Sequence, residues 1–317
     1  MLPILLFSLS ITGPICLMLV LGVLFKRMGL INENFIEVGS KLVFQVTLPA
    51  MLFLSIANAG GGLSLAQPFI LYGLLASVVF FVFTSVAVKA AFPQSADSGV
   101  IIQGSFRANT AIIGIAYVAN AYGAQGVAVA ALYVAVTTIL YNVLATLCLT
   151  PKGGASGFQL AKLMGKSLTK NPLIISIVAG GVVYGLSVPV PSIVTESGQY
   201  LARMTLPLAL LCTGGSLDLS AMRASARAPW FATLFKLVLA PVLITLGGAW
   251  LGFRNIELAV LFFMNAAPVA AASYVMARSM GGNAALAANI IALTTLLSTF
   301  TCSLGVMVLT SLGLIAT

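Results

Sequence analysis

The chain carries long apolar segments with little polar sequence between them, and this constrains its fold more than any other feature. A helix needs about 20 apolar residues to cross the hydrocarbon core of a bilayer. Lipid admits only helices and closed barrels, because backbone polar groups find no water there. Ten such segments are predicted, at residues 4–25, 35–57, 67–90, 98–121, 125–149, 171–188, 192–214, 229–251, 257–279 and 284–314. The sequence therefore predicts an all-α polytopic membrane protein with ten transmembrane helices.

The composition agrees with a location in the lipid bilayer. Hydrophobic residues make up 60% of the chain and charged residues 7%, so the polar side chains are too few to cover a surface that faces water. The formal net charge of +9 would favour nucleic acid as the partner of a soluble protein. Here the basic residues fall mostly in loops, where membrane topology explains them, and no nucleic-acid partner is expected.

The two halves of the chain resemble each other. Pro14 and Gly22 recur 158 positions later as Pro172 and Gly180. Further pairs, 156 to 158 positions apart, are Thr47-Leu48-Pro49 with Thr205-Leu206-Pro207, Asn109 with Asn265, Tyr117 with Tyr274, Gly123 with Gly281, and Thr137-Thr138 with Thr294-Thr295. An ordered series of this kind indicates an internal duplication. We therefore predict a first five-helix repeat at residues 1–150, a linker at 151–170 and a second five-helix repeat at 171–317.

An odd number of spans in each repeat makes the second repeat enter the membrane from the opposite side, so the repeats are predicted to be inverted. Lysine and arginine favour the cytoplasmic side of a membrane. The residues assigned to that side are Lys26, Arg27, Lys41, Lys89, Lys152, Lys162, Lys166, Lys170, Arg223, Arg227 and Arg278, against Arg254 on the other. This predicts a multi-pass protein of the inner (plasma) membrane, with a cytoplasmic linker and both termini outside.

The fourth and ninth spans are predicted to be broken helices. In the ninth, Pro268 follows Asn265-Ala266-Ala267, and a proline inside a helix removes an amide donor and clashes with the preceding turn. In the fourth, a polar run from Gln103 to Thr110 is followed by Gly114. Such breaks survive in a membrane only where they are buried in protein or line a cavity.

Two broken helices from inverted halves can present the positive amino ends of their second parts to one point, which creates an anion site. Arg107 lies about nine residues into its span, roughly 14 Å deep at the helical rise of about 1.5 Å per residue. A charged side chain at that depth usually has a function. Arg107 could instead have a structural role and pair with a carbonyl. Asn109 and Asn265 would add amide donors. The other candidate substrate-binding residues are Thr110, Gly114, Pro268, Thr137, Thr138, Thr294 and Thr295.

The four threonines in the spans after the breaks have an alternative role, since their hydroxyls can bond to carbonyls of their own helices. Lys236, in the eighth span, is close enough to the cytoplasmic side for its amine to reach the interface.

Acidic residues and histidine are missing from the centres of the spans. The chain has no histidine, and its acidic residues near the span ends are Glu33, Glu37, Asp97, Glu196, Asp218 and Glu257. This argues against a carboxylate proton relay and against a sodium site built on acidic side chains. Sodium bound by carbonyls and hydroxyls, or movement driven by the membrane potential, stays open. An intramembrane protease would need paired aspartates or a zinc motif, so no enzyme, catalytic residue, cofactor or metal site is expected.

The chain resembles the auxin efflux carrier family, especially the bacterial members described as malonate or organic-acid permeases. The residues that carry the resemblance are Gly22 to Leu30, Leu42-Val43-Phe44, Leu48-Pro49, Asn109 with Ile113-Gly114-Ile115, Asn171-Pro172, Leu206 to Leu210 with Gly214 and Leu217, and Pro268 with Thr294 to Ser298. The family commonly has a proline shortly after the Ile-Gly-Ile of the fourth span, where this chain has Ala116.

This resemblance implies ten helices in two inverted repeats. Spans one, two, six and seven would form a scaffold, and the other six spans a transport part. It also implies a homodimer formed through the scaffold, elevator-like movement of the transport part, and a substrate site at the crossover of spans four and nine that includes Asn109 and Asn265.

The function that we predict is secondary transport of a small organic anion, such as a malonate-like dicarboxylate, by elevator-type alternating access. The alternatives are efflux of an auxin-like aromatic weak acid and a bile-acid-type sodium symporter, whose acidic sodium ligands have no counterpart here. A channel is a further alternative, which saturable exchange of substrate would separate from a carrier. The sequence leaves open the substrate, the direction of transport and the coupling ion.

Overall fold

The computed structural model describes residues 2–58, 67–150, 171–217 and 227–316. The predicted linker at 151–170 and Arg223 lie outside these described residues. The helices are α1 (Leu2–Arg27), α2 (Glu33–Leu42), η1 (Val43–Thr47), α3 (Leu48–Ala57), α4 (Gln67–Ala91), α5 (Ser98–Phe106), η3 (Thr110–Gly114), α6 (Ile115–Leu149), α8 (Pro172–Gly185), α9 (Ser192–Gly215), α10 (Arg227–Leu234), η5 (Phe235–Leu239), α11 (Ala240–Trp250), α12 (Asn255–Ala266), α13 (Ala272–Ser279) and α14 (Ala284–Ser311).

The helices account for all the regular structure in the part of the chain that is described, apart from one isolated β-bridge. Six helical segments there are long and apolar enough to cross a bilayer, and two shorter apolar helices are α8 and α12. The six are Pro3–Arg27, Glu33–Ala57, Pro68–Ala91, Thr110–Leu149, Arg227–Trp250 and Ala284–Ser311. The predicted all-α polytopic membrane protein is confirmed.

Two of these long segments contain a π turn just before a proline. The turn η1 precedes Pro49 and the turn η5 precedes Pro241. Because proline has no amide hydrogen, the regular bonding pattern is interrupted there, and a π turn accommodates the change without ending the helix. The segments 33–57 and 227–250 are therefore each one continuous helix.

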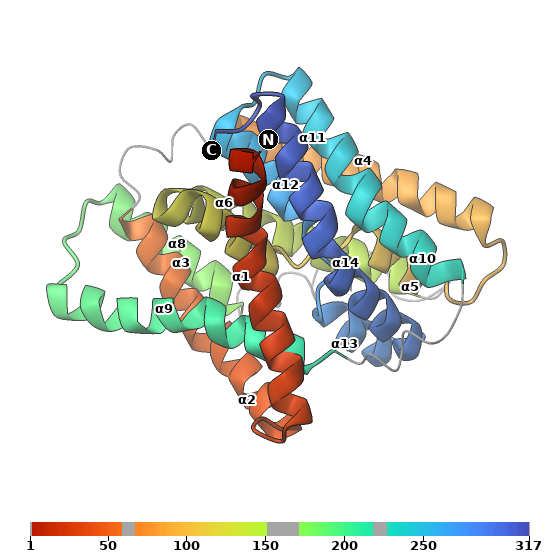
Figure 1. Cartoon of the computed structure of the whole chain (residues 1–317), viewed down its shortest axis with the longest axis horizontal. Coiled ribbons are helices and arrows are strands. Elements are labelled where there is room, and N and C mark those ends of the chain that lie inside the picture. The colour runs from red at the N-terminus through yellow and green to blue at the C-terminus, as the bar shows by residue number, and fades with distance from the viewer. Residues whose placement is uncertain (1, 59–66, 151–170, 218–226, 317) are drawn as a thin grey trace.

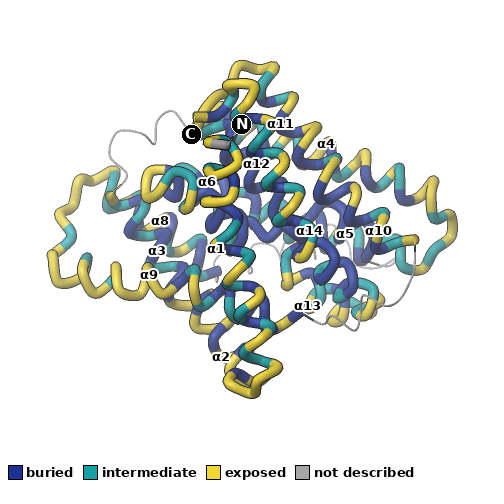
Figure 2. The backbone as a smooth tube through the Cα atoms, viewed as in Figure 1, coloured by how far each residue is buried: buried dark blue, intermediate teal, exposed yellow. Residues whose placement is uncertain are grey.

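The helices form two groups that meet along the middle of the molecule (Figure 1). In the first group, α3 packs against α8 and α9, and α9 also packs against α1 and α2. In the second group, α10 packs against α5 and α14, and α12 against α11. Helix α6 contacts members of both groups, and α1 contacts α14. Buried residues concentrate inside the second group and where the groups meet, whereas α1, α8 and α9 expose apolar outer faces (Figure 2).

Two helices are interrupted, and their interruptions cross. Helix α5 ends at Phe106, and the chain becomes helical again at Thr110; α12 ends at Ala266, and α13 begins at Ala272. Ala108 and Val269 form an antiparallel bridge. Next to it, the amide of Asn109 donates to the carbonyl of Pro268 over 2.7 Å. A proline in the place of Ala116 is therefore not required for the first interruption, which lies before Thr110.

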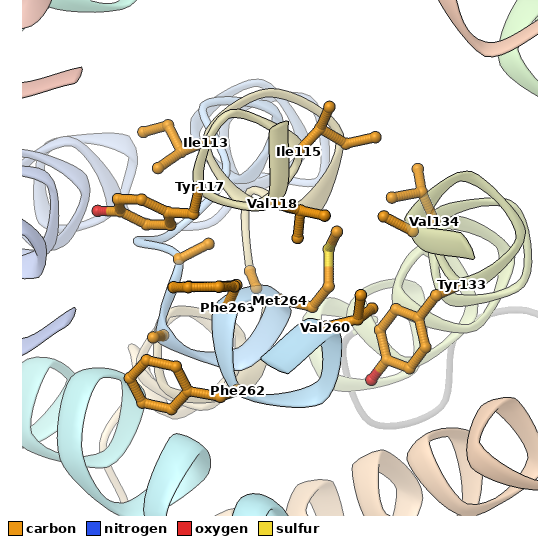
Figure 3. Close-up of a cluster of buried hydrophobic side chains, with 14 of the residues drawn as sticks. Ile113, Ile115, Tyr117, Val118, Tyr133, Val134, Val260, Phe262, Phe263 and Met264 are labelled. Atoms are coloured by element: carbon orange, nitrogen blue, oxygen red, sulfur yellow. The ribbon is translucent and has the colours of Figure 1, made fainter. Parts of the chain in front are cut away.

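The end of α12 packs between two arms of α6 (Figure 3). The ring of Phe263 stacks on Tyr117 from the first arm, with their centroids 5.9 Å apart. The second arm begins where α6 kinks at Gly123, whose φ of 55° and ψ of −147° are accessible to glycine but strained for other residues. Gly114 permits close approach, because an added Cβ would lie 2.9 Å from the sulfur of Met264. This packing fixes the position of the crossing.

Candidate functional site

A cavity of about 940 Å³ lies beside the crossing, between the two groups of helices. One wall comes from α2, η1, α8 and α9, and the other from the first interruption, α6 and α13. The amino ends of both second half-helices reach it: residues 109–112 line it at the start of η3, and residues 270–272 line it at the start of α13. The first amides of a helix have no acceptor within the helix, and this end carries partial positive charge.

Arg107 lies in the cavity wall at the carboxyl end of α5. Its side chain is 6% exposed, and the guanidinium donates to the amide oxygen of Asn142 over 2.8 Å and to the sulfur of Met276 over 2.6 Å. A guanidinium has five N–H donors, so donors are left for a ligand. Arg107, which the sequence predicts as a substrate-binding residue, thus lines the cavity.

The charges around the cavity are of one sign. Lys41, which is exposed, lines the wall formed by the first group of helices. Together with Arg107 it supplies the charged side chains of the lining, and no carboxylate is found among the described residues that line it. Two cations and two helix amino ends therefore give the cavity a positive potential, which favours anions.

A polar stripe on α6 faces the cavity. Thr138, Asn142 and Thr146 all line it, and their spacing of four residues places them on one face of a helix. Thr138 and Thr110 are the predicted threonines that reach the cavity. Asn142 is a cavity residue that sequence reasoning missed, although the i, i+4 pattern with Thr138 would have pointed to it.

Asn109 and Asn265 do not face each other across the cavity. Asn109 lines it, but Asn265 is buried in the last turn of α12. There its amide donates to the carbonyl of Leu261 over 2.8 Å and to the hydroxyl of Tyr133 over 3.4 Å. The two interruptions differ in length, residues 107–109 against residues 267–271. Residues that the sequence repeat aligns are therefore not at equivalent places.

The remaining predicted residues lie behind the cavity wall. Gly114 and Pro268 shape the crossing rather than line the cavity. The hydroxyls of Thr137, Thr294 and Thr295 donate to Tyr133, Ile290 and Ile291 carbonyls over 2.7, 2.8 and 2.7 Å. The Thr294 hydroxyl also accepts from the amide of Val269 over 3.2 Å, so this threonine supports the second interruption.

Lys236 does not reach the cytoplasmic interface, and that expectation was wrong. Its side chain is 0% exposed, and its Nζ donates to the carbonyl of Asn265 over 2.6 Å. The carbonyls at the carboxyl end of α12 attract a cation because they lack helical partners. The lysine therefore points inward, towards the crossing.

Interrupted membrane helices that cross beside a cavity are typical of transporters. A family model described as membrane transport protein matches residues 12–306, and the chain belongs to this family, the auxin efflux carrier-like family that its motifs resemble. An uncharacterized transporter of Methanothermobacter thermautotrophicus is 22% identical over 288 residues, which cover 90% of this chain and 92% of the relative. One of Methanocaldococcus jannaschii is 24% identical over 277 residues, covering 83% and 86%. The protein is thus a multi-pass membrane transporter and not an enzyme.

Proposed function

We propose that the protein is a secondary transporter that carries a small organic anion, with a malonate-like dicarboxylate as the leading substrate. The observation that supports this most directly is the cavity, in which two half-helix amino ends and the side chains of Arg107 and Lys41 surround one space. Backbone amides and a guanidinium both bind carboxylates through charge-assisted hydrogen bonds. Asn109 and Thr110 would orient the ligand.

The proposed mechanism is elevator-type alternating access. The chain would form ten transmembrane helices in two inverted repeats. Helices α1, α2–α3, α8 and α9 would be the scaffold, and α4–α6 with α10–α14 the transport part. The position of the cavity between these two groups supports this division, because a substrate bound at the crossing would move with the transport part. The apolar outer faces of α1 and α9 are consistent with a homodimer formed through the scaffold.

The proposed location is the inner (plasma) membrane with both termini outside. Lys26 and Arg27 at the end of α1 and Lys41 on α2 would then be cytoplasmic, in keeping with the preference of basic residues for that side. The cavity, which includes Lys41, would be open towards the cytoplasm in this structure.

A specific observation favours the second candidate, an auxin-like aromatic weak acid. Much of the cavity lining is apolar, and it includes the rings of Phe44 and Tyr141. Its volume is near the upper end of the range of about 300–1,000 Å³ that holds drug-sized ligands. A monocarboxylate with an aromatic body would use the positive end of the cavity and also its apolar wall.

The test is uptake of radiolabelled malonate into proteoliposomes under a set membrane potential, with and without sodium and proton gradients. Unlabelled carboxylates, including malonate and indole-3-acetate, compete in parallel. Saturable uptake that dicarboxylates inhibit supports the leading proposal. Inhibition by indole-3-acetate alone would replace it with the aromatic-acid alternative, and flux that does not saturate would indicate a channel.

A further inference from the structure

Lys236 is a buried cation that the anion cavity does not use. It lies in the π turn η5, is 0% exposed and does not line the cavity. Its Nζ donates to the carbonyl of Asn265 over 2.6 Å. Asn265 is in the last turn of α12, directly before the interruption that pairs with residues 108 and 109. The amine is therefore hydrogen-bonded to the backbone directly beside the crossing.

The surroundings of Lys236 do not neutralise a charge. The elements packed against η5 are α5, α10, α11, α12 and α14, and Phe235 also stacks on Phe83 of α4. The charged or titratable groups on these elements, directly beside them in the chain, or next to Asn265 are Asp97, Arg107, Arg227, Arg254, Glu257, Cys302, Tyr72, Lys89 and Tyr133. Glu257 is the carboxylate on the packed helices, and it lies eight residues before Asn265, about 12 Å along the helix. Among the described residues the ion pair within 4 Å joins Lys26 to Glu33, away from this site.

Both protonation states of Lys236 fit this geometry. A charge buried without a counter-ion is costly, and lysine, unlike arginine, can lose its proton in such a place. A neutral amine keeps N–H groups and can still donate to the Asn265 carbonyl. The contact therefore holds the side chain in place whether or not it carries a proton.

The crossing connects this amine to the cavity. Three residues after Asn265, the carbonyl of Pro268 accepts from the amide of Asn109, which lines the cavity. An anion bound there would stabilise a positive charge on Lys236, because charges interact strongly across a protein interior of low dielectric constant. By linkage, a protonated Lys236 would stabilise the bound anion to the same extent.

We propose that Lys236 is a proton-coupling residue, which takes up a proton when an organic anion binds in the cavity and releases it when the anion leaves. The amine lone pair forms the N–H bond with a proton from water on the side of uptake, and that proton returns to water on the side of release. Lys236 is closed off from water in this structure, so the exchange requires the helices around η5 to separate. The inference rests on the proposed function, since it needs an anion in the cavity.

The first test observes the amine without requiring transport. The protein is labelled with ¹³C at the lysine Cε, and the signal missing from Lys236→Met is assigned to Lys236. We expect the titration of this signal to move to higher pH on addition of malonate or indole-3-acetate. Lys89, which is exposed at the end of α4, provides the control variant. A Lys236 signal whose titration neither acid moves would overturn the proposal.

The second test measures coupling directly. Calorimetric binding of the same two acids, in buffers of different ionisation enthalpy, should show about one proton taken up per anion. This uptake, and a fall in affinity of up to about tenfold for each pH unit, should occur between the titration midpoints of the free and the anion-bound protein. Anion binding without proton uptake and without a shift of the Lys236 signal would reject the coupling and leave the proposed function standing. If neither acid binds, the proposed substrates are wrong. A Lys236 signal that neither acid shifts then also rejects coupling to these two acids.

Variants separate coupling from a structural role. Lys236→Arg keeps a permanent positive charge, so anion binding should continue but lose its pH dependence and its proton uptake. Lys236→Met should lose proton uptake and bind the anion more weakly, and Lys89→Met is the matched control that should behave as the unaltered protein. Proton uptake that persists in folded Lys236→Arg would assign the proton to another group.

Discussion

At the scale of single residues, Arg107 shows how a charge is held ready for a ligand. Two uncharged groups fix its guanidinium, the amide oxygen of Asn142 and the sulfur of Met276. Neither neutralises it, so the positive charge stays available to the cavity. A carboxylate partner in the same place would have made Arg107 part of a closed ion pair.

Replacing Arg107 by alanine should weaken anion binding. A hydrogen bond to a charged group contributes about 1.5–3 kcal/mol, which corresponds to about a 10- to 100-fold loss of affinity. The measurement is the inhibition constant of malonate or indole-3-acetate against the uptake of radiolabelled malonate into proteoliposomes. Arg203→Ala is the control, because Arg203 is exposed and does not line the cavity. Unchanged affinity in folded Arg107→Ala would remove this side chain from the site.

Asn142→Asp is a sharper test of the same charge. The side chains have nearly the same shape, but the aspartate would form an ion pair with Arg107 and add a negative charge to the cavity. We expect anion affinity to fall at least as far as in Arg107→Ala, while thermal stability is retained. Asn142→Ala should have a smaller effect, because it removes only the orienting bond. Equal affinities in Asn142→Asp and the unaltered protein would show that the ligand does not sense this charge.

The residues of the site were predicted unevenly, for physical reasons. Arg107 and Asn109 could be found because a charge and an amide in an apolar span have few structural uses. Asn142 was missed because a single asparagine on a long helix is a weak signal without its neighbour Arg107. Asn265 and three of the threonines were predicted as ligands, but each donates a hydrogen bond to a carbonyl of its own helix, which sequence spacing does not reveal.

At the scale of elements, hydrophobic length predicted an all-helical membrane protein with long apolar helices. Pro268 predicted the interruption at residues 267–271. The prediction of the interruption at residues 107–109 was based on glycine and polar residues. The structure shows why the helix can break there without a proline. Its backbone is completed by the opposite interruption, through Asn109 and Pro268. The π turns η1 and η5 were not predicted, because a proline in a helix can produce a kink or a π turn, and tertiary packing decides between them.

Gly123 sets the angle between the two arms of α6. Its φ of 55° and ψ of −147° should cost about 1–3 kcal/mol in any other residue. We therefore expect Gly123→Ala to lower the midpoint of thermal unfolding in detergent. The matched control is Gly181→Ala on α8, where an added Cβ meets nothing within 4 Å and helix propensity should raise stability by up to about 1 kcal/mol. Equal midpoints for the two variants would contradict the role of Gly123.

At the scale of the whole molecule, the family, the helical class and the membrane location could be read from the sequence. The order of apolar spans and motifs extends along the chain, and the family match covers residues 12–306. The shape of the cavity could not be read, because it depends on how α8, α9 and α13 approach one another across long sequence separations. Substrate choice depends on that shape and on a few polar groups, so it is the least determined property.

Topology gives the prediction at this scale. Leu30 lies in the turn after α1, and Leu251 lies in the turn after α11; both are exposed. In a protein whose four native cysteines are replaced by alanine, we expect Leu251→Cys to react with a membrane-impermeant maleimide on intact cells. Leu30→Cys should react only after permeabilisation. The reverse pattern would place the termini in the cytoplasm and overturn the proposed orientation.

The bond that joins the two interruptions connects backbone atoms, the amide of Asn109 and the carbonyl of Pro268. Any residue except proline supplies that amide, and every residue supplies that carbonyl. Mutations on the cavity wall can therefore accumulate without breaking the joint at the centre of the molecule. A lineage built on this architecture can exchange one transported compound for another in small steps, while the crossing of its helices stays the same.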